Sequence, residues 1–99
     1  GTLNVGVGSN ALADNTTGIE NFGLGGAALR KMITGNYNVA IGTFSLSNNT
    51  AGSNNVAIGR QAGLNNLGSG NMFLGYQAGL SETGNNMLYV SNTSSANPL

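Results

Sequence analysis

Short apolar runs recur along the chain at a nearly constant spacing, and each run is opened by Asn and closed by Gly. The five runs are Asn4–Gly8, Asn21–Gly25, Asn38–Gly42, Asn55–Gly59 and Asn71–Gly75. Their closing glycines are 17, 17, 17 and 16 residues apart. Within each run two apolar residues lie two positions apart, which is typical of a β-strand, and the 3.6-residue spacing of an amphipathic helix is missing. The pattern therefore predicts short strands within a 16–17-residue repeat.

Two further columns of residues keep the same period. A small residue follows each closing Gly by three positions, at Ala11, Ala28, Ser45, Ala62 and Ala78. A second glycine ends each unit, at Gly18, Gly35, Gly52, Gly68 and Gly84. A sixth, partial unit is expected at Asn86–Val90, with Val90 in place of the closing Gly, as is usual for a repeat that caps a stack. We therefore assign residues 1–90 to one repeat domain and residues 91–99 to a polar linker or the start of another module.

The connections between the strands decide the fold class. Two-residue hairpins favour Asn-Gly or Asp-Gly, and neither dipeptide occurs although the chain has 17 Gly and 17 Asn. Identical registers 17 residues apart instead favour an all-β parallel solenoid in which each unit is one coil. The opening Asn residues of successive units would then lie one above another. Their side chains could form a hydrogen-bonded ladder along the stack, or each could be a turn residue that bonds only to local backbone. Glycine closes each strand where a positive φ is often needed.

Composition excludes several classes of function. Six charged residues with zero net charge supply no basic cluster for nucleic acid or anionic lipid, and no apolar stretch is long enough for a membrane span. The chain has no Cys and no His, so the commonest catalytic bases and soft metal ligands are missing. Asp14, Glu20 and Glu82 fall in different columns of the repeat and form no acid pair. We expect no enzyme activity, no cofactor and no metal site. No signal peptide is visible, and a start at Gly1 rather than Met suggests a piece of a longer chain.

Three weaker sequence patterns are candidate sites. The pattern G-x-G-x-x-A occurs at Gly6, Gly8 and Ala11 and again at Gly23, Gly25 and Ala28, but a dinucleotide site needs a βαβ unit that a 17-residue repeat cannot hold. Asp14 and Lys31 share a column, and we favour an exposed ion pair over a recognition spot. Arg60 and Tyr76 share another column, with Gln61 and Gln77 beside them. These four could bind a glycan or a protein, although packing over the coil edge is the favoured interpretation. No receptor-binding residue is assigned.

One chain offers a thin core. We expect the two apolar positions that flank the central residue of each run to supply ten buried side chains across five coils. Runs such as Val39–Ile41 are apolar or small on both faces, which is the pattern of a strand covered on both sides. One face can point into the coil and the other needs a neighbour, so an obligate oligomer is expected.

The repeats Asn38–Gly42 and Ser53–Gly59 resemble the YadA-like head repeat of trimeric autotransporter adhesins. The longer unit found here, with its terminal stretch Ser69–Val90, is even more similar to repeats of bacteriophage tail fibres that precede an intramolecular chaperone of the endosialidase type. The resemblance covers about residues 3–92. It implies a left-handed β-roll assembled as a homotrimer, whereas the general crossover rule would favour the right hand. The repeat unit of this chain departs from the adhesin repeat in one respect, because the adhesin repeat is usually shorter than 16–17 residues.

The function expected from these observations is a non-enzymatic structural or adhesive segment of a trimeric extracellular fibre, most simply a phage tail fibre that takes part in host attachment. The alternative is the head of a bacterial trimeric autotransporter adhesin on the cell surface. A third class, a solenoid that binds ice or a polysaccharide, needs a uniform Thr or Asn face, and the columns are too mixed to offer one. The expected partners are two further copies of the chain and a cell-surface glycan or protein.

Overall fold

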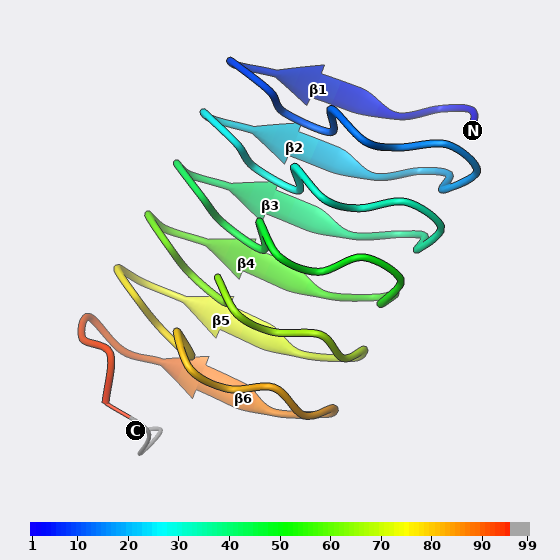
Figure 1. Cartoon of the computed structure of the whole chain (residues 1–99). Helices are drawn as coiled ribbons and strands as arrows, with labels where there is room; N and C mark the ends of the chain where they lie inside the picture. Colours follow the sequence, from blue (N-terminus) through cyan, green and yellow to red (C-terminus); the bar gives the residue numbers. More distant parts are fainter. Residues whose placement is uncertain (96–99) are drawn as a thin grey trace.

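The computed structural model describes residues 1–95 and shows an all-β parallel solenoid of about five turns, with about 17 residues in each coil (Figure 1). The strands are β1 (Val5–Val7), β2 (Phe22–Leu24), β3 (Val39–Ile41), β4 (Val56–Ile58), β5 (Met72–Leu74) and β6 (Leu88–Val90). They form one six-stranded sheet in chain order, and every neighbouring pair is parallel. A return arm connects each strand to the next. Of the expected linker, residues 91–95 follow β6 without helix or strand, and residues 96–99 lie outside the described part.

Pairing of the strands follows the predicted columns through β5. Val5 lies opposite Phe22, Phe22 opposite Val39, and Val39 opposite Val56. The prediction for the sixth unit was wrong by one residue, because Met72 pairs with Leu88 rather than with Met87. Met87 therefore takes the place of the opening Asn and Ser91 that of the closing Gly. This register turns Tyr89 inward and Leu88 outward, whereas the predicted register would have exposed the tyrosine ring and buried Leu88.

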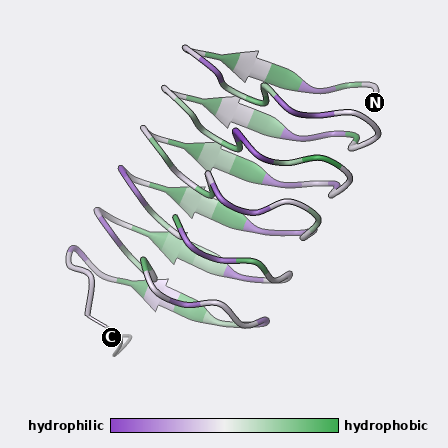
Figure 2. Ribbon diagram, in the orientation of Figure 1, coloured by the Kyte–Doolittle hydropathy of each residue, from purple (hydrophilic) through white to green (hydrophobic). Residues whose placement is uncertain are grey.

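The interior of each coil is lined by the central residue of the strand and by the return arm. Gly23, Ala40, Ala57, Phe73 and Tyr89 occupy the central position and are buried. The small column predicted from Ala28, Ser45, Ala62 and Ala78 is buried as well. The expectation that the flanking strand residues form this core was wrong, because they alternate with the central residue and point out of the coil. Figure 2 shows how the hydrophobic residues concentrate along the strands while the arms are mixed.

Large and small side chains exchange places along the interior. In the first three coils the strand offers Gly6, Gly23 and Ala40, and the arm supplies Leu12, Leu29 and Leu46. In the fourth and fifth coils the arm residues are Gly63 and Gly79, and the ring of Phe73 from β5 fills the space beside both of them. A Cβ added to Gly63 would lie 2.6 Å from Cδ2 of Phe73. The core therefore keeps a similar filling from coil to coil although its large residue changes sides, as close packing requires.

The opening asparagines form a continuous hydrogen-bonded ladder. In Asn55, the backbone N–H and the side-chain Nδ2 both donate to Oδ1 of Asn38, each at 3.0 Å. The same Nδ2 also donates to the carbonyl of Gly68 at the end of its own coil, at 2.9 Å. The pattern repeats at Asn38 and Asn71, so each buried amide uses both of its N–H donors. At the C-terminal end the ladder closes when the N–H of Met87 donates to Oδ1 of Asn71. The ladder hypothesis is confirmed.

A second side-chain column runs down the arm. Oδ1 of Asn49 accepts from the N–H of Gly52 at 2.7 Å, and Nδ2 of Asn49 donates to Gly68 and Asn66. Met32 interrupts this column between Asn15 and Asn49. As a result, within the described residues, Nδ2 of Asn15 is buried without a hydrogen-bond partner.

The two glycine columns exist for different physical reasons. Gly42 closes β3 with a φ of 126°, and a Cβ there would lie 2.6 Å from the carbonyl carbon of Gly59 in the next coil. Positive φ was predicted for this column and is confirmed. The second column, exemplified by Gly35, has no such φ. A Cβ on Gly35 would instead collide with the carbonyl oxygen of Gly52, so this column is set by the close approach of neighbouring backbones.

Left-handed backbone extends well beyond glycine. Three positions per coil have φ between 49° and 63° even where they carry a side chain, as at Tyr37, Phe44 and Leu46. Such values are uncommon for bulky residues. Backbone hydrogen bonds between the arms of neighbouring coils hold them, since the N–H of Phe44 donates to the carbonyl of Gly26 and that of Leu46 to the carbonyl of Ala62. These positions turn the short arm tightly enough to close a coil.

Candidate interaction surface

The outer face of the sheet is apolar from one end of the solenoid to the other. Each strand places its first and third residues on this face, so six strands supply two columns of six side chains. The residues of one column are Val5, Phe22, Val39, Val56, Met72 and Leu88, and those of the other are Val7, Leu24, Ile41, Ile58, Leu74 and Val90. None of them is charged or polar. Neighbouring strands are about 4.8 Å apart, so the face is a continuous stripe about 24 Å long.

Much of this stripe is open to solvent in the single chain. The third residue of β4, Ile58, is 38% exposed, and Met72 and Leu74 of β5 are 45% and 43% exposed. Val39 and Val56 are half-buried because their column neighbours cover them from both sides. A soluble monomer rarely shows a contiguous apolar patch of this extent. We therefore treat the stripe, called the outer strand face below, as the candidate site.

An open depression continues the outer strand face at its C-terminal end. It has a volume of about 450 Å³ and is lined by Leu74, Val90, Ser91 and Asn92. Its walls are mainly the ends of β5 and β6, so it belongs to the same apolar surface.

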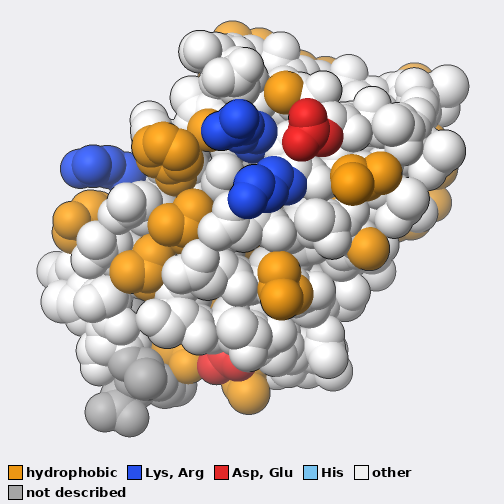
Figure 3. Space-filling model, viewed as in Figure 1, with side chains coloured by type: hydrophobic (Ala, Val, Ile, Leu, Met, Phe, Trp, Pro, Cys, Tyr) orange, Lys and Arg blue, Asp and Glu red, His pale blue; other side chains and the backbone are white. Residues whose placement is uncertain are grey.

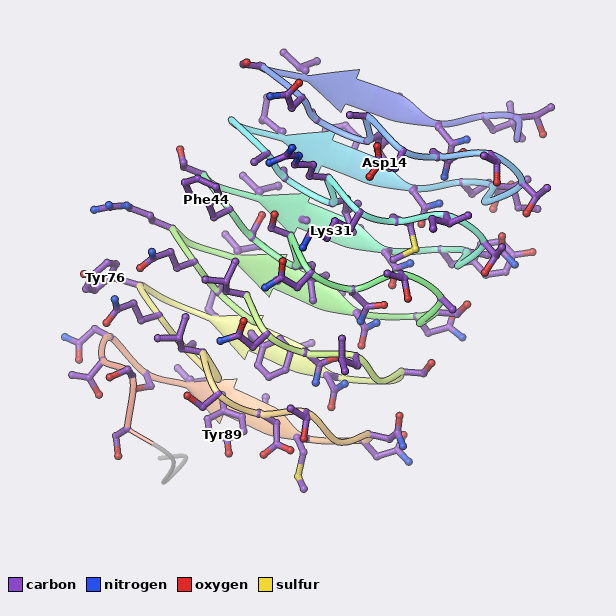
Figure 4. All side chains as sticks on the ribbon, viewed as in Figure 1. Asp14, Lys31, Phe44, Tyr76 and Tyr89 are labelled. Atoms are coloured by element: carbon purple, nitrogen blue, oxygen red, sulfur yellow. The ribbon has the colours of Figure 1, made fainter. Side chains whose placement is uncertain are left out.

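The corner that follows each strand carries the pair of columns singled out from the sequence. Arg60 is exposed and Tyr76 is 45% exposed, so neither is packed away over the coil edge. The two glutamines beside them do pack on each other, since Nε2 of Gln77 donates to Oε1 of Gln61 at 2.8 Å. Phe44, which lies one coil before Arg60 and is 41% exposed, is at the same corner as Tyr76, as the labels of Figure 4 show. Sequence reasoning missed Phe44, although it belongs to the same column as Gln61 and Gln77.

Asp14 and Lys31 lie one coil apart on the arm side of the solenoid and both are exposed, but these two described side chains do not form the predicted ion pair (Figure 4). Figure 3 shows that basic and acidic side chains lie close together on this face. Further along the same column, Nδ2 of Asn48 donates to Oδ1 of Asn65 at 2.8 Å. The arm face is therefore polar and mixed in charge, in contrast to the outer strand face.

The C-terminal end of the interior is closed by Tyr89 and Glu82. The Tyr89 ring stacks at a tilt on Phe73 with centroids 5.8 Å apart, and its hydroxyl donates to Oε1 of Glu82 at 2.8 Å. Oε2 of Glu82 accepts from the N–H of Gly84 at 2.9 Å. The bond from Tyr89, followed by that from Gly84, lowers the pKa of Glu82, and the same bond to Glu82 raises the pKa of Tyr89. Sequence reasoning considered Glu82 only as a possible member of an acid pair. Its column, shared with Asn49 and Asn66, was the signal that could have identified it as a cap.

Little else in the described residues suggests chemistry. A cavity of about 50 Å³ at Gly79, Ser81, Glu82, Tyr89, Ser94 and Ser95 is large enough for water and far below the size of a cofactor site. Gly6 and Gly8 of the first G-x-G-x-x-A pattern face the interior and the next coil, where a Cβ on Gly8 would lie 2.7 Å from the Gly25 carbonyl carbon, so a pyrophosphate has no room. Residues 1–95 bring together no group of three potential metal-ligating side chains. Within that range no helix is long and apolar enough to cross a bilayer.

The fold and the surface thus define a parallel β-solenoid with one apolar face. Comparison of the chain with protein-family models, with curated proteins and with solved structures finds no match in any of the three.

Proposed function

We propose that the chain is a structural and adhesive segment of a trimeric extracellular fibre, most simply a phage tail fibre used in host attachment. The observation that carries the proposal is the outer strand face. Its two columns of apolar side chains are the surface that the sheet would bury if it were covered on both sides. In the proposed assembly three copies wind as left-handed β-rolls, stand side by side and turn these faces toward a common axis. The number three and the left hand come from the resemblance to the adhesin and tail-fibre repeats.

The arrangement suits a fibre mechanically. The Asn ladder and the strand pairs run along the long direction of the solenoid, so hydrogen bonds resist stretching of the stack. Burial of the outer strand face would add lateral packing, with each Val, Leu or Ile worth about 1.5–3 kcal/mol when fully covered. The polar arm face with Asp14 and Lys31 would stay in water. The role needs no catalytic group, cofactor or metal.

Light scattering coupled to size-exclusion chromatography tests the assembly. Three copies of a 9.9 kDa chain give a mass of about 30 kDa, and a mass near 10 or 20 kDa would contradict the trimer. Ile58→Lys places a charge on the outer strand face, and Thr50→Lys places the same charge on an exposed arm. We expect Ile58→Lys to lower the mass or abolish folding, as judged by circular dichroism, while Thr50→Lys stays trimeric. A fully trimeric Ile58→Lys would show that this face is not the interface.

A further inference from the structure

The corner after the strands presents a short strip of side chains, two adjacent columns wide, that the repeat does not require. It consists of Phe44, Arg60, Gln61, Tyr76 and Gln77 from the third, fourth and fifth coils, and we call it the corner ridge. In the first two coils the equivalent residues are Ser9, Asn10, Gly26 and Ala27. The column that opens the strands keeps Asn and the column that closes them keeps Gly through the first five coils. The corner ridge gains two aromatic rings and a cation in three adjacent coils, so its composition has a reason other than coil closure.

The backbone of the ridge is fixed by the stack. The N–H of Gln61 donates to Thr43 and the N–H of Gln77 donates to Arg60, at 2.8 and 2.9 Å. Phe44, Gln61 and Gln77 all have φ near 60°, and the side-chain bond between the two glutamines orients their amides. A ligand that met this row would therefore find the backbone and the two glutamine amides already ordered, which lowers the entropy lost on binding.

The chemistry of the row selects a ligand class. Phe44 and Tyr76 lie two coils apart, which is about 9.6 Å along the stack, and they are 41% and 45% exposed. Aromatic faces at such intervals can stack on the apolar faces of alternate rings of an extended polymer. The glutamine amides carry both a donor and an acceptor for hydroxyl groups. Arg60, between the two rings and exposed, offers the planar fork that binds a carboxylate with two hydrogen bonds.

The shape of the row argues against a protein partner. The two cavities described above are lined by other residues, and the ridge is a strip only two columns wide rather than a broad patch. A stable protein interface needs about 800 Å² from each partner, which three corner positions do not supply. An extended chain of rings matches a narrow row better.

We infer that the corner ridge binds an acidic polysaccharide, with sugar rings stacked on Phe44 and Tyr76 and a sugar carboxylate held by Arg60. The inference deepens the proposed attachment role and rests on it, since it names the class of host ligand. The outer strand face ends two residues before the ridge, so trimer formation would leave the ridge at the rim of the assembly, open to solvent.

Isothermal titration with the full chain tests the inference. The probes are oligosaccharides of polygalacturonate, hyaluronan and α2,8-linked polysialate, together with the methyl-esterified galacturonate of the same length as a neutral match. We expect saturable binding of at least one acidic oligosaccharide, and for galacturonate a preference over its ester. Arg60→Gln should weaken that binding about tenfold, and Tyr76→Ala and Phe44→Ala should weaken it as well. Lys31→Gln removes a cation from the arm face and should leave binding unchanged.

The outcomes separate this inference from the proposed fibre. The mass of every sample is measured first, so loss of the trimer is seen independently of sugar binding. A trimer that binds no acidic oligosaccharide would overturn the ligand assignment and leave the proposed fibre standing. Equal weakening by Lys31→Gln and Arg60→Gln would show that attraction by general charge, and not the ridge, causes binding.

Discussion

The ring of Phe73 occupies the space that a side chain at Gly79 would need. A Cβ on Gly79 would collide with the Cδ1 edge of that ring. The backbone of Gly79, with φ of 62°, differs little from that of Leu46, which holds a leucine at φ of 49° in the equivalent position. Space, and not backbone conformation, therefore demands glycine at this position.

This relationship predicts a compensating pair. Gly79→Leu alone overpacks the interior, and Phe73→Ala alone leaves a cavity that should cost about 3–5 kcal/mol. The double variant rebuilds the arrangement of the first three coils, with a small strand residue and a leucine on the arm. We expect it to be less destabilised than the sum of the single variants by about 1–3 kcal/mol. Chemical denaturation at one protein concentration measures this, and strict additivity would refute the size exchange.

The interrupted arm column predicts opposite effects of one substitution at two positions. Asn15→Met removes a buried amide nitrogen without a partner, together with only the long bond of 3.4 Å in which Oδ1 of Asn15 accepts from Nδ2 of Asn4. It also extends the apolar contact of Met32, so the free energy of unfolding should rise by up to about 1 kcal/mol. Asn49→Met removes an amide that bonds Gly52, Gly68 and Asn66, and should cost about 2–4 kcal/mol. Thermal unfolding of the two variants against the parent decides the matter. If both were destabilised equally, the unpaired state of Asn15 would carry no penalty.

Two glycines of the same corner should respond differently to alanine. At Gly42 an added Cβ meets backbone of the next coil at 2.6 Å under a φ of 126°, so we expect Gly42→Ala to cost more than about 2 kcal/mol. At Gly26 the nearest atom is Cγ2 of Thr43 at 3.9 Å, and Gly26→Ala should change stability by less than about 0.5 kcal/mol. Their midpoints of thermal unfolding provide the comparison, with Gly26→Ala as the matched control.

The cap formed by Glu82 and Tyr89 predicts loss of stability in acid. The pKa of Glu82 is lowered in the folded chain, first by the Tyr89 hydroxyl and then by the Gly84 amide. Its contribution is therefore present above the pKa of the unfolded carboxyl, and is lost as the pH falls through the lower, folded pKa. The raised pKa of Tyr89 has the opposite pH dependence. Its contribution to stability is fully present below the pKa of an unfolded tyrosine and is lost as the pH rises through the higher, folded pKa and the hydroxyl ionises.

Melting temperatures between pH 2 and pH 7 test the predicted loss of stability in acid. The parent should lose stability as the pH falls, and Glu82→Gln should flatten this slope. Tyr89→Phe removes the largest cause of the lowered pKa and should flatten it partly while keeping the ring stacked on Phe73. Parallel slopes in all three proteins would exclude Glu82 as the source.

Much of the fold could be predicted from the spacing of a few residues. Opening Asn and closing Gly predicted the coil and its parallel strands because both residues recur in the first five coils, one for the ladder and one for the turn. The end of the stack was harder. Asn85 and Asn86 stand together before β6, and neither opens it, because the inward packing of Tyr89 on Phe73 sets the register.

The candidate site was predicted less completely. The need for a neighbour followed from the runs, but the inward or outward direction of each residue depends on the arm that lies across the coil. Leu29 and Leu46 fill the interior from that arm, and they leave room there for only one strand residue. No pattern of two-residue alternation within a three-residue strand could distinguish this arrangement from its inverse.

The shortening of the later coils by one residue has a consequence for how such a chain can vary. Two residues separate Asn49 from Gly52, whereas Leu67 alone separates Asn66 from Gly68, yet β4 and β5 stay in register. Length differences are absorbed at this one bend while both flanking columns remain aligned. The bend is thus a place where extra residues could be inserted and displayed on the surface, as a loop grafted onto an unchanged scaffold.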